Sequence, residues 1–403
     1  MGRRFLEGYD PTGLVCRINR VVSFPVQNSC RQRKSDLTFK IETNEHSFLG
    51  QQVPIGQVTN ELQALFADDE KDQDSGITRA SLINLAIYQE GPESLEVAAE
   101  TVAEIVQEAA CRSILIGADT KGETGAKAWV QAHCQILGRD YRKTVCTEQL
   151  AFQLTGATPG LVRNTVFAHL DSDLPLVFWW RGEFSEAFSD RLFTRIDRLV
   201  FNSCSWSDPR SQFLRLRQAS AEAKASFIPH DLSFTRLNPI RSAIARCFDD
   251  PLPRKEASRI SSVEIQHGSN FRMPALYLAA WLATRLKCDL LANESDTQSF
   301  RFRRRSSGEI SGLTVNLKAV DEGCEAICSV DMKSNNAHFS LNRKDNNRFW
   351  ELTSKIGNCP ANVELLPMPD RSDAVLVTEI LMRGGRNHVL CDALKVVREM
   401  LVI

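Results

Sequence analysis

One stretch of the chain, residues 171–206, constrains the fold more than any other. Seven consecutive apolar residues at 174–180 have the length of a strand that is buried on both faces. Apolar residues then recur every four positions over 188–196, as on one helical face, and a second short apolar run follows at 199–201. This order and spacing predict a βαβ unit with two parallel strands.

Polar and aromatic residues gather where these two predicted strands end. In open α/β sheets, ligands and partners bind beyond the carboxyl ends of the strands. The candidate surface for a partner or effector therefore consists of Trp179, Trp180, Arg181, Gly182, Asn202 and Ser203. The two tryptophans are equally candidates for the core, because neighbouring strand residues point to opposite faces and both faces can be covered by helices.

Strands and helices alternate on either side of this unit, which predicts an α/β domain with a mostly parallel sheet over 48–250. Residues 1–47, rich in Arg, Gln, Ser and Asn, are expected to be an N-terminal extension. The Pro- and charge-rich segment 251–262 is expected to be a linker. Alternating segments separated by turn residues, followed by two helices, predict an α+β domain with an antiparallel meander over 263–403.

Individual segments lead to more specific expectations. Residues 126–137 mix polar and apolar side chains and are expected to be polar surface, whereas 142–148 is expected to be a short strand. Thr158 followed by Pro159 predicts the start of a helix. In the second domain, strands are expected over 263–266, 300–304, 313–319, 326–332 and 338–341.

A run of arginines lies on one of these expected strands. Arg301, Arg303 and Arg305 would share one face, about 6.6 Å apart, with Phe300 and Phe302 on the other. One interpretation is a solvated outer face, and the other is a docking surface for an acidic partner or a phosphorylated metabolite. We expect no nucleic-acid partner, because one basic strand in a chain of net charge -1 makes a poor electrostatic footprint.

The composition, 43% hydrophobic and 25% charged over 403 residues, is that of an ordinary globular protein. No window of eighteen apolar residues occurs and the first residues lack the apolar segment of a signal peptide, so we expect a cytoplasmic protein without membrane contact. The twelve cysteines are scattered and most are expected to be buried thiols. The seven histidines are dispersed, so no metal site is expected.

The signatures of catalysis are missing from the sequence. Neither Gly-x-Gly-x-x-Gly nor Gly-x-Ser-x-Gly occurs. Gly117 and Gly122 have the spacing of a phosphate loop, but Glu123 stands where the phosphate-binding lysine is required, and its carboxylate would repel a phosphate. We therefore expect neither an enzyme nor a bound cofactor.

Segments 173–182 and 197–203 resemble the OpcA family, the glucose-6-phosphate dehydrogenase assembly proteins. Further similar segments follow the same order as in the family and begin at Thr78, Cys111, Val145, Arg236 and Ala279. The resemblance extends from about residue 48 to the C-terminal end and is densest before residue 286.

This resemblance implies a non-catalytic assembly factor and allosteric activator of glucose-6-phosphate dehydrogenase. That enzyme stands at the entry to the oxidative pentose phosphate pathway, which produces NADPH. In cyanobacteria the control is linked to thiol redox state, which implies a thioredoxin-type redox partner. The residues alone leave an alternative open: a sugar-phosphate- or nucleotide-binding enzyme or sensor of α/β type, with its ligand at the carboxyl edge of the sheet.

Overall fold

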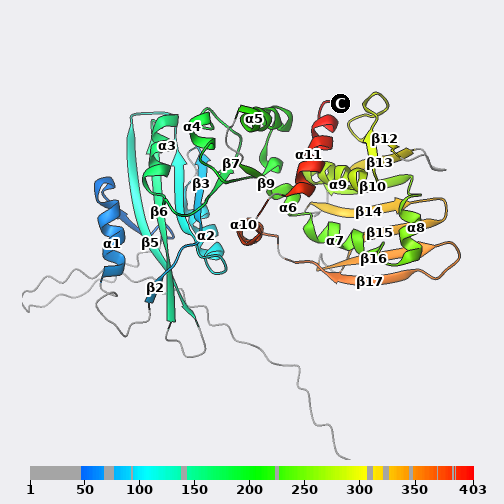
Figure 1. The fold of residues 1–403 in the computed structure, drawn as a ribbon, viewed down its shortest axis with the longest axis horizontal. Helices are drawn as coiled ribbons and strands as arrows, with labels where there is room; N and C mark the ends of the chain where they lie inside the picture. The colour runs from blue at the N-terminus through cyan, green and yellow to red at the C-terminus, as the bar shows by residue number, and fades with distance from the viewer. Residues whose placement is uncertain are drawn as a thin grey trace, which may run out of the picture.

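The computed structural model describes residues 47–67, 77–91, 94–137, 143–222, 227–305, 312–320, 326–344, 348–369, 371–383, 385 and 387–403. Their strands form two large sheets that lie side by side, each with helices packed against it (Figure 1). Apart from residue 47, the expected N-terminal extension lies outside the described residues.

The first sheet has the strand order β1-β5-β6-β4-β3-β7-β8-β9, with β2 added beside β6. The neighbours from β6 to β9 are all parallel, whereas β5 and β1 run antiparallel to the strands beside them. This agrees with the prediction of a mostly parallel sheet. The strands are β1 (Gln51–Val53), β2 (Ile77–Arg79), β3 (Asn84–Glu90), β4 (Arg112–Ala118), β5 (Gly125–Leu137), β6 (Lys143–Thr155), β7 (Leu176–Arg181), β8 (Arg198–Phe201) and β9 (Ile228–Asp231).

Eight α-helices precede residue 258 in the described part of the chain, and the last two of them, α7 and α8, lie against the second sheet (Figure 1). One of the eight, α3, begins as predicted: Pro159 is its first residue, and Thr158 Oγ1 accepts a hydrogen bond from the Leu161 amide (3.2 Å). The helices are α1 (Val58–Ala67), α2 (Glu96–Ile105), α3 (Pro159–Ala168), α4 (Asp190–Phe193), α5 (Pro209–Glu222), α6 (Leu232–Thr235), α7 (Asn238–Arg246) and α8 (Pro251–Ala257).

Four expected segments differ from the structure. The short strand expected at 142–148 is the beginning of the thirteen-residue strand β6. The helix between β7 and β8 is the single turn α4, and turns on either side of it bring Phe188 and Ile196 into the core. The expected linker contains α8, because the prolines that suggest a linker also suit the first turn of a helix. The expected polar surface at 126–137 belongs to the long strand β5, which buries Ala128, Val130 and His133.

The second sheet has the order β11-β12-β13-β10-β14-β15-β16-β17. All neighbours are antiparallel except β10 and β13, because β10 inserts between β13 and β14 and so interrupts the expected meander. Strands β16 and β17 have no counterpart among the expected ones. The strands are β10 (Ser262–Gly268), β11 (Cys288–Leu290), β12 (Ser299–Arg304), β13 (Gly312–Val320), β14 (Ile327–Lys333), β15 (Ala337–Lys344), β16 (Phe349–Ile356) and β17 (Asn362–Pro367).

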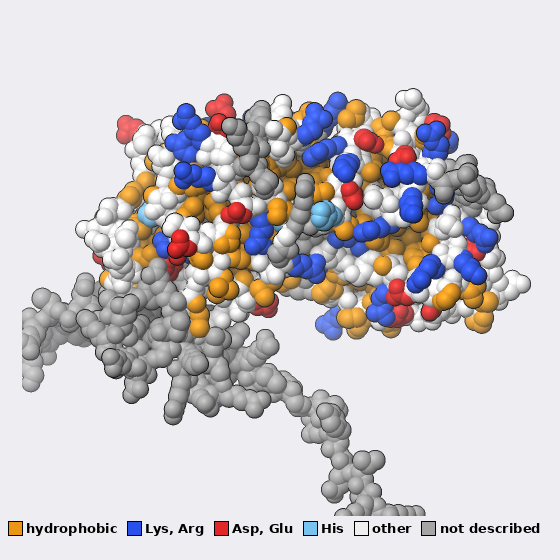
Figure 2. All heavy atoms as spheres, viewed as in Figure 1, with side chains coloured by type: hydrophobic (Ala, Val, Ile, Leu, Met, Phe, Trp, Pro, Cys, Tyr) orange, Lys and Arg blue, Asp and Glu red, His pale blue; other side chains and the backbone are white. Residues whose placement is uncertain are grey.

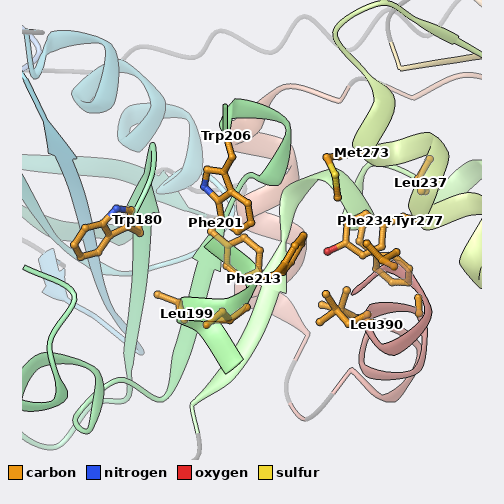
Figure 3. Close-up of a cluster of buried hydrophobic side chains, with 14 of the residues drawn as sticks. Trp180, Leu199, Phe201, Trp206, Phe213, Phe234, Leu237, Met273, Tyr277 and Leu390 are labelled. Carbon is orange, nitrogen blue, oxygen red and sulfur yellow. The ribbon is translucent and has the colours of Figure 1, made fainter. Parts of the chain in front are cut away.

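Three further helices connect the two sheets: α9 (Arg272–Arg285), α10 (Asp373–Met382) and α11 (His388–Met400). Helix α10 follows the last strand of the second sheet, yet it packs beside α2 on the first sheet. Figure 1 shows α10 and α11 at the junction between the two halves. At this junction the core is continuous, and Figure 3 shows the side chains that meet there, among them Phe201, Phe213, Phe234, Tyr277 and Leu390.

Candidate functional site

The two tryptophans of β7 lie in the core. Trp180 is fully buried, its ring centroid is 4.4 Å from that of Tyr88, and its Nε1 donates to the Glu183 carbonyl (2.8 Å). Trp179 is 2% exposed and points to the opposite face of the sheet. This corrects their candidacy as surface residues: helices cover both faces of β7, so neither side chain can touch a partner directly.

Arg181 is the last residue of β7, and Gly182 follows it directly. The guanidinium of Arg181 is half-buried, lies 5.5 Å from the ring centroid of Trp179, and donates to Gln89 Oε1 (3.1 Å). Gly182 has a φ of +85°, which favours glycine, and its carbonyl accepts a hydrogen bond from Trp206 Nε1 (2.9 Å). These contacts fix the turn after the strand and leave Gly182 exposed.

Asn202 and Ser203 follow β8 and serve mainly to hold the neighbouring loops. Asn202 Oδ1 accepts hydrogen bonds from the Cys204 amide (3.3 Å) and from Ser233 Oγ (2.9 Å). Ser203 is fully buried, and its amide donates to Asp231 Oδ1 (3.2 Å). The structure therefore brings these two predicted residues together around a carboxylate that the sequence analysis did not single out.

That carboxylate, Asp231, is fully buried at the carboxyl end of β9. Besides the Ser203 amide, it accepts from the Ser233 amide (2.8 Å) and from the hydroxyl of Tyr277 on α9 (2.7 Å). Burial raises the pKa of the Asp231 carboxyl, and these hydrogen bonds oppose the rise. The only sequence signal was an acidic residue at the end of a short strand, while Tyr277 lies within an apolar helix.

The buried cluster connects β9 to α6, to α9 and to the turn after β8. Protein donors surround the carboxylate of Asp231, and solvent does not reach it. No ligand could contact Asp231 without displacing Ser203, Ser233 or Tyr277. The expectation of a ligand at this edge of the sheet gains no support from the described residues.

The arginine ribbon, Arg301, Arg303 and Arg305, follows the predicted alternation. All three side chains are exposed, whereas Phe300 and Phe302 are buried on the other face. Arg301 lies 3.7 Å from Glu294. Arg305 donates to both carboxylate oxygens of Asp289, and this contact lowers the pKa of that carboxyl.

The strand pairing extends this basic surface across the second sheet. From Arg301 the register leads through Thr314 and Ser262 to Lys333, then to His338 and Lys355. The last three side chains are exposed, and Asp331 Oδ1 accepts a hydrogen bond from His338 Nε2 (2.8 Å). We call this set, from Arg301 to Lys355, the basic row.

Three cysteines of the described residues depart from the expectation of buried thiols, since Cys328 on β14 is disulfide-bonded and two others bridge neighbouring strands. Cys134 on β5 and Cys146 on β6 stand directly opposite each other and form a disulfide with a Cα–Cα distance of 4.0 Å. Cys146 is buried and Cys134 is half-buried. Free thiols elsewhere in the described chain are Cys111, Cys204, Cys247, Cys288, Cys359 and Cys391.

Two features are absent from the residues that the structure describes. None of the helices there has both the length and the apolar character needed to cross a membrane. No group of three or more His, Cys, Asp or Glu side chains in the same residues could hold a metal ion.

Comparison with known proteins finds two family models that match in succession. Residues 102–218 match the glucose-6-phosphate dehydrogenase subunit N-terminal domain, and residues 229–394 match the C-terminal domain of the same subunit, both under the name OpcA. Two curated relatives are named OxPP cycle protein OpcA. That of Nostoc punctiforme is 26% identical over 196 residues (48% of this chain, 42% of the relative), and that of Synechococcus elongatus is 24% identical over 218 residues (51% and 48%).

These matches span less than half the length of either relative. Among solved structures, levoglucosan dehydrogenase in complex with NADH has a TM-score of 0.45 at 9% identity, covering 81% of this chain and 96% of that one. A similarity this distant carries no functional argument.

Proposed function

The chain belongs to the OpcA family of glucose-6-phosphate dehydrogenase subunits, and from this premise we propose that it assembles with that dehydrogenase and activates it allosterically. The observation that carries the proposal is the match of both subunit domains, in order, over residues 102–218 and 229–394. The names of the curated relatives support a role in the oxidative pentose phosphate cycle.

We further propose that the protein itself is not an enzyme. The support comes from the polar residues at the carboxyl edge of the first sheet, which is where an α/β enzyme would keep its reacting groups. Here Asp231 is enclosed by three protein donors, and Arg181 is engaged by Gln89 and Trp179. These side chains are used to hold the fold.

For the docking surface we favour the basic row together with the ribbon. The two tryptophans of the other candidate surface are buried, whereas Arg301, Arg303 and Lys333 are exposed on a sheet face. On the face drawn in Figure 2, Lys and Arg side chains are also concentrated over the half that contains the second sheet. Such a surface is complementary to an acidic patch on the dehydrogenase.

Mixing the two purified proteins tests the proposal. The dehydrogenase should change its oligomeric state by light scattering and should show a lower KM for glucose 6-phosphate when this protein is present. Heat-denatured protein and an equal amount of serum albumin are the controls. If neither the oligomeric state nor the kinetics respond, the proposed function fails.

We also propose that activation is linked to redox state through the Cys134–Cys146 disulfide. Its support is position: the bridge joins two strands at one end of their pairing, and Cys134 is partly accessible to a reductant. Thioredoxin with a reducing system should alter activation by the wild type and leave Cys134→Ser/Cys146→Ser unaffected. An equal response of the double variant would assign the redox effect to other cysteines.

A further inference from the structure

A cavity of about 600 Å³ lies between the helices α6 and α7, the second sheet and the segment that precedes α10. Arg236 at the end of α6, Arg343 on β15 and Arg371 before α10 line it, although they are far apart in the sequence. Trp350 and Phe271 add aromatic walls. Its size falls within the range of small-molecule sites, roughly 300–1,000 Å³.

The charge of the described lining residues is uneven. Three arginines face a single carboxylate, that of Asp373, which leaves an excess of two positive charges. Asp373 is itself engaged, because it accepts a hydrogen bond from Arg236 Nη2 (3.1 Å). The cavity therefore favours an anion over a neutral or cationic molecule.

The guanidinium of Arg371 is largely buried, yet its hydrogen bonds to neighbouring residues are long. Its side chain is 18% exposed, and its two terminal nitrogens reach Glu379 and the Thr235 carbonyl only at 3.4 Å. Its Nε is buried and finds no hydrogen-bond acceptor among the described residues. A buried donor without an acceptor is costly, so an acceptor supplied by a ligand would be stabilising.

Further arginines interact electrostatically with the cavity residue Arg371. Burial lowers the pKa of Arg241 to about 9, and the positive charges of Arg285, Arg383 and Arg371 contribute to that lowering. The nearby carboxylate of Glu379 opposes it. This crowding of like charges would be relieved by a bound anion.

Helix α10 adds to the positive potential. Ser372, its N-cap, and Asp373, its first residue, both line the cavity, so the N-terminal end of a ten-residue helix faces this space. The aligned peptide dipoles of a helix favour negative charge at that end.

We propose that this cavity binds a small phosphate monoester, with the phosphoryl group held by Arg236, Arg343 and Arg371 and the rest of the molecule against Trp350 and Phe271. A phosphate monoester carries about −1.5 to −2 charges at pH 7, which balances the excess of the described lining residues. Guanidinium groups match phosphate oxygens two at a time. A single carboxylate would neutralise only half of that excess. The inference goes beyond the proposed function, because binding here requires no dehydrogenase.

Calorimetric titration of the full chain alone tests the proposal. The probes are glucose 6-phosphate, glycerol 3-phosphate and adenosine monophosphate, with glucose and citrate as controls at constant ionic strength. At least one monoester should bind at one site per chain and be displaced by inorganic phosphate, whereas glucose should give no heat. Arg343→Gln and Arg371→Gln should each weaken binding at least tenfold, and Arg210→Gln, at an exposed arginine of α5, should leave it unchanged.

Arg371 also contacts Glu379, so its loss could affect folding. Arg371→Lys keeps the charge without the planar fork and should bind the monoester between wild type and Arg371→Gln. Thermal melts identify variants that remain folded. Three results would overturn the proposal: no heat with any monoester, tighter binding of citrate, or unchanged affinity in folded cavity variants. None of them depends on whether the dehydrogenase is the partner.

Discussion

The hydroxyl of Tyr277 on α9 donates a 2.7 Å hydrogen bond to the carboxylate of Asp231 at the end of β9, and both groups are fully buried. This contact ties the helix of the second half directly to the parallel sheet of the first. A buried carboxylate needs its donors, so the pair is an energetic link between the two halves as well as a geometric one.

Removing that donor should destabilise the protein. Tyr277→Phe leaves Asp231 with two amide donors and an unsatisfied oxygen, and we expect a loss of about 1–3 kcal/mol in the free energy of unfolding, measured with urea. Tyr88→Phe is the matched control, because the acceptor of Tyr88 is the exposed carboxylate of Glu90, which water can satisfy. Equal losses in the two variants would contradict the argument.

Acid should destabilise the protein through His230. Burial, with a contribution from the charge of Arg198, lowers the pKa of His230 to about 4 in the folded chain, against 6.5 for an ordinary histidine. The unfolded chain therefore takes up a proton first, and stability is lost as the pH falls from about 6.5 to 4, by roughly 3 kcal/mol.

Urea titrations between pH 7 and pH 4 measure this effect. His230→Gln should lose less stability than the wild type over that interval, while His338→Gln, at an exposed histidine, should follow the wild type. Parallel curves for wild type and His230→Gln would show that His230 does not carry the acid sensitivity.

Trp180 should be a determinant of stability. Its ring packs against Tyr88, Phe184 and Phe188 without exposure to solvent. We expect Trp180→Ala to lower the free energy of unfolding by about 3–5 kcal/mol, and Leu82→Ala, at a side chain that is 71% exposed, to change little. A stable Trp180→Ala variant that no longer binds the dehydrogenase would instead indicate a docking role.

Charge reversal on the ribbon should weaken the proposed complex. The variant Arg301→Glu/Arg303→Glu/Arg305→Glu changes only exposed side chains, so folding should be retained. Its affinity for the dehydrogenase should fall by at least about tenfold, most strongly at low salt. Surface plasmon resonance measures the affinity of each variant for the dehydrogenase. Arg191→Glu/Arg210→Glu/Arg217→Glu changes net charge equally on the first half and serves as the control; comparable loss there would mean a non-specific charge effect.

Reduction of Cys134–Cys146 should cost stability without changing the fold. The bridge closes a short loop, 12 positions in sequence, and such crosslinks typically contribute about 2–4 kcal/mol. The strands β5 and β6 pair along their whole lengths, which holds them without the bridge. We expect dithiothreitol to lower the Tm of the wild type by more than it lowers that of Cys134→Ser, because the disulfide of Cys328 is reduced in both, with unchanged circular dichroism. Loss of the β signal would show that the bridge is needed for folding.

Buried central elements could be predicted from the sequence. The apolar runs of β7 and β8 are unbroken because both sheet faces are covered, and Thr158-Pro159 carries the capping chemistry of α3. Outer strands gave weaker signals. Strand β5 has one polar face, and β17, at the edge of the second sheet, exposes even Val363 and Leu365.

The sites were less predictable, since they depend on residues far apart in the sequence. Arg236, Arg343 and Arg371 meet only because α10 returns to the first sheet, and nothing local marks them. The same holds for Asp231 and Tyr277. The alternation of Arg301, Phe302 and Arg303 is a local property of one strand, and it was therefore predictable.

The position of α10 also has a consequence during biosynthesis. Leu376 and Ile380 of α10 belong to the same buried cluster as Trp179, which is made nearly two hundred residues earlier. At roughly 5–20 residues per second, that face of the first sheet stays without its cover for on the order of ten to forty seconds on the ribosome. An exposed apolar sheet face is a target for chaperones and for aggregation, so the nascent chain needs protection until α10 has emerged.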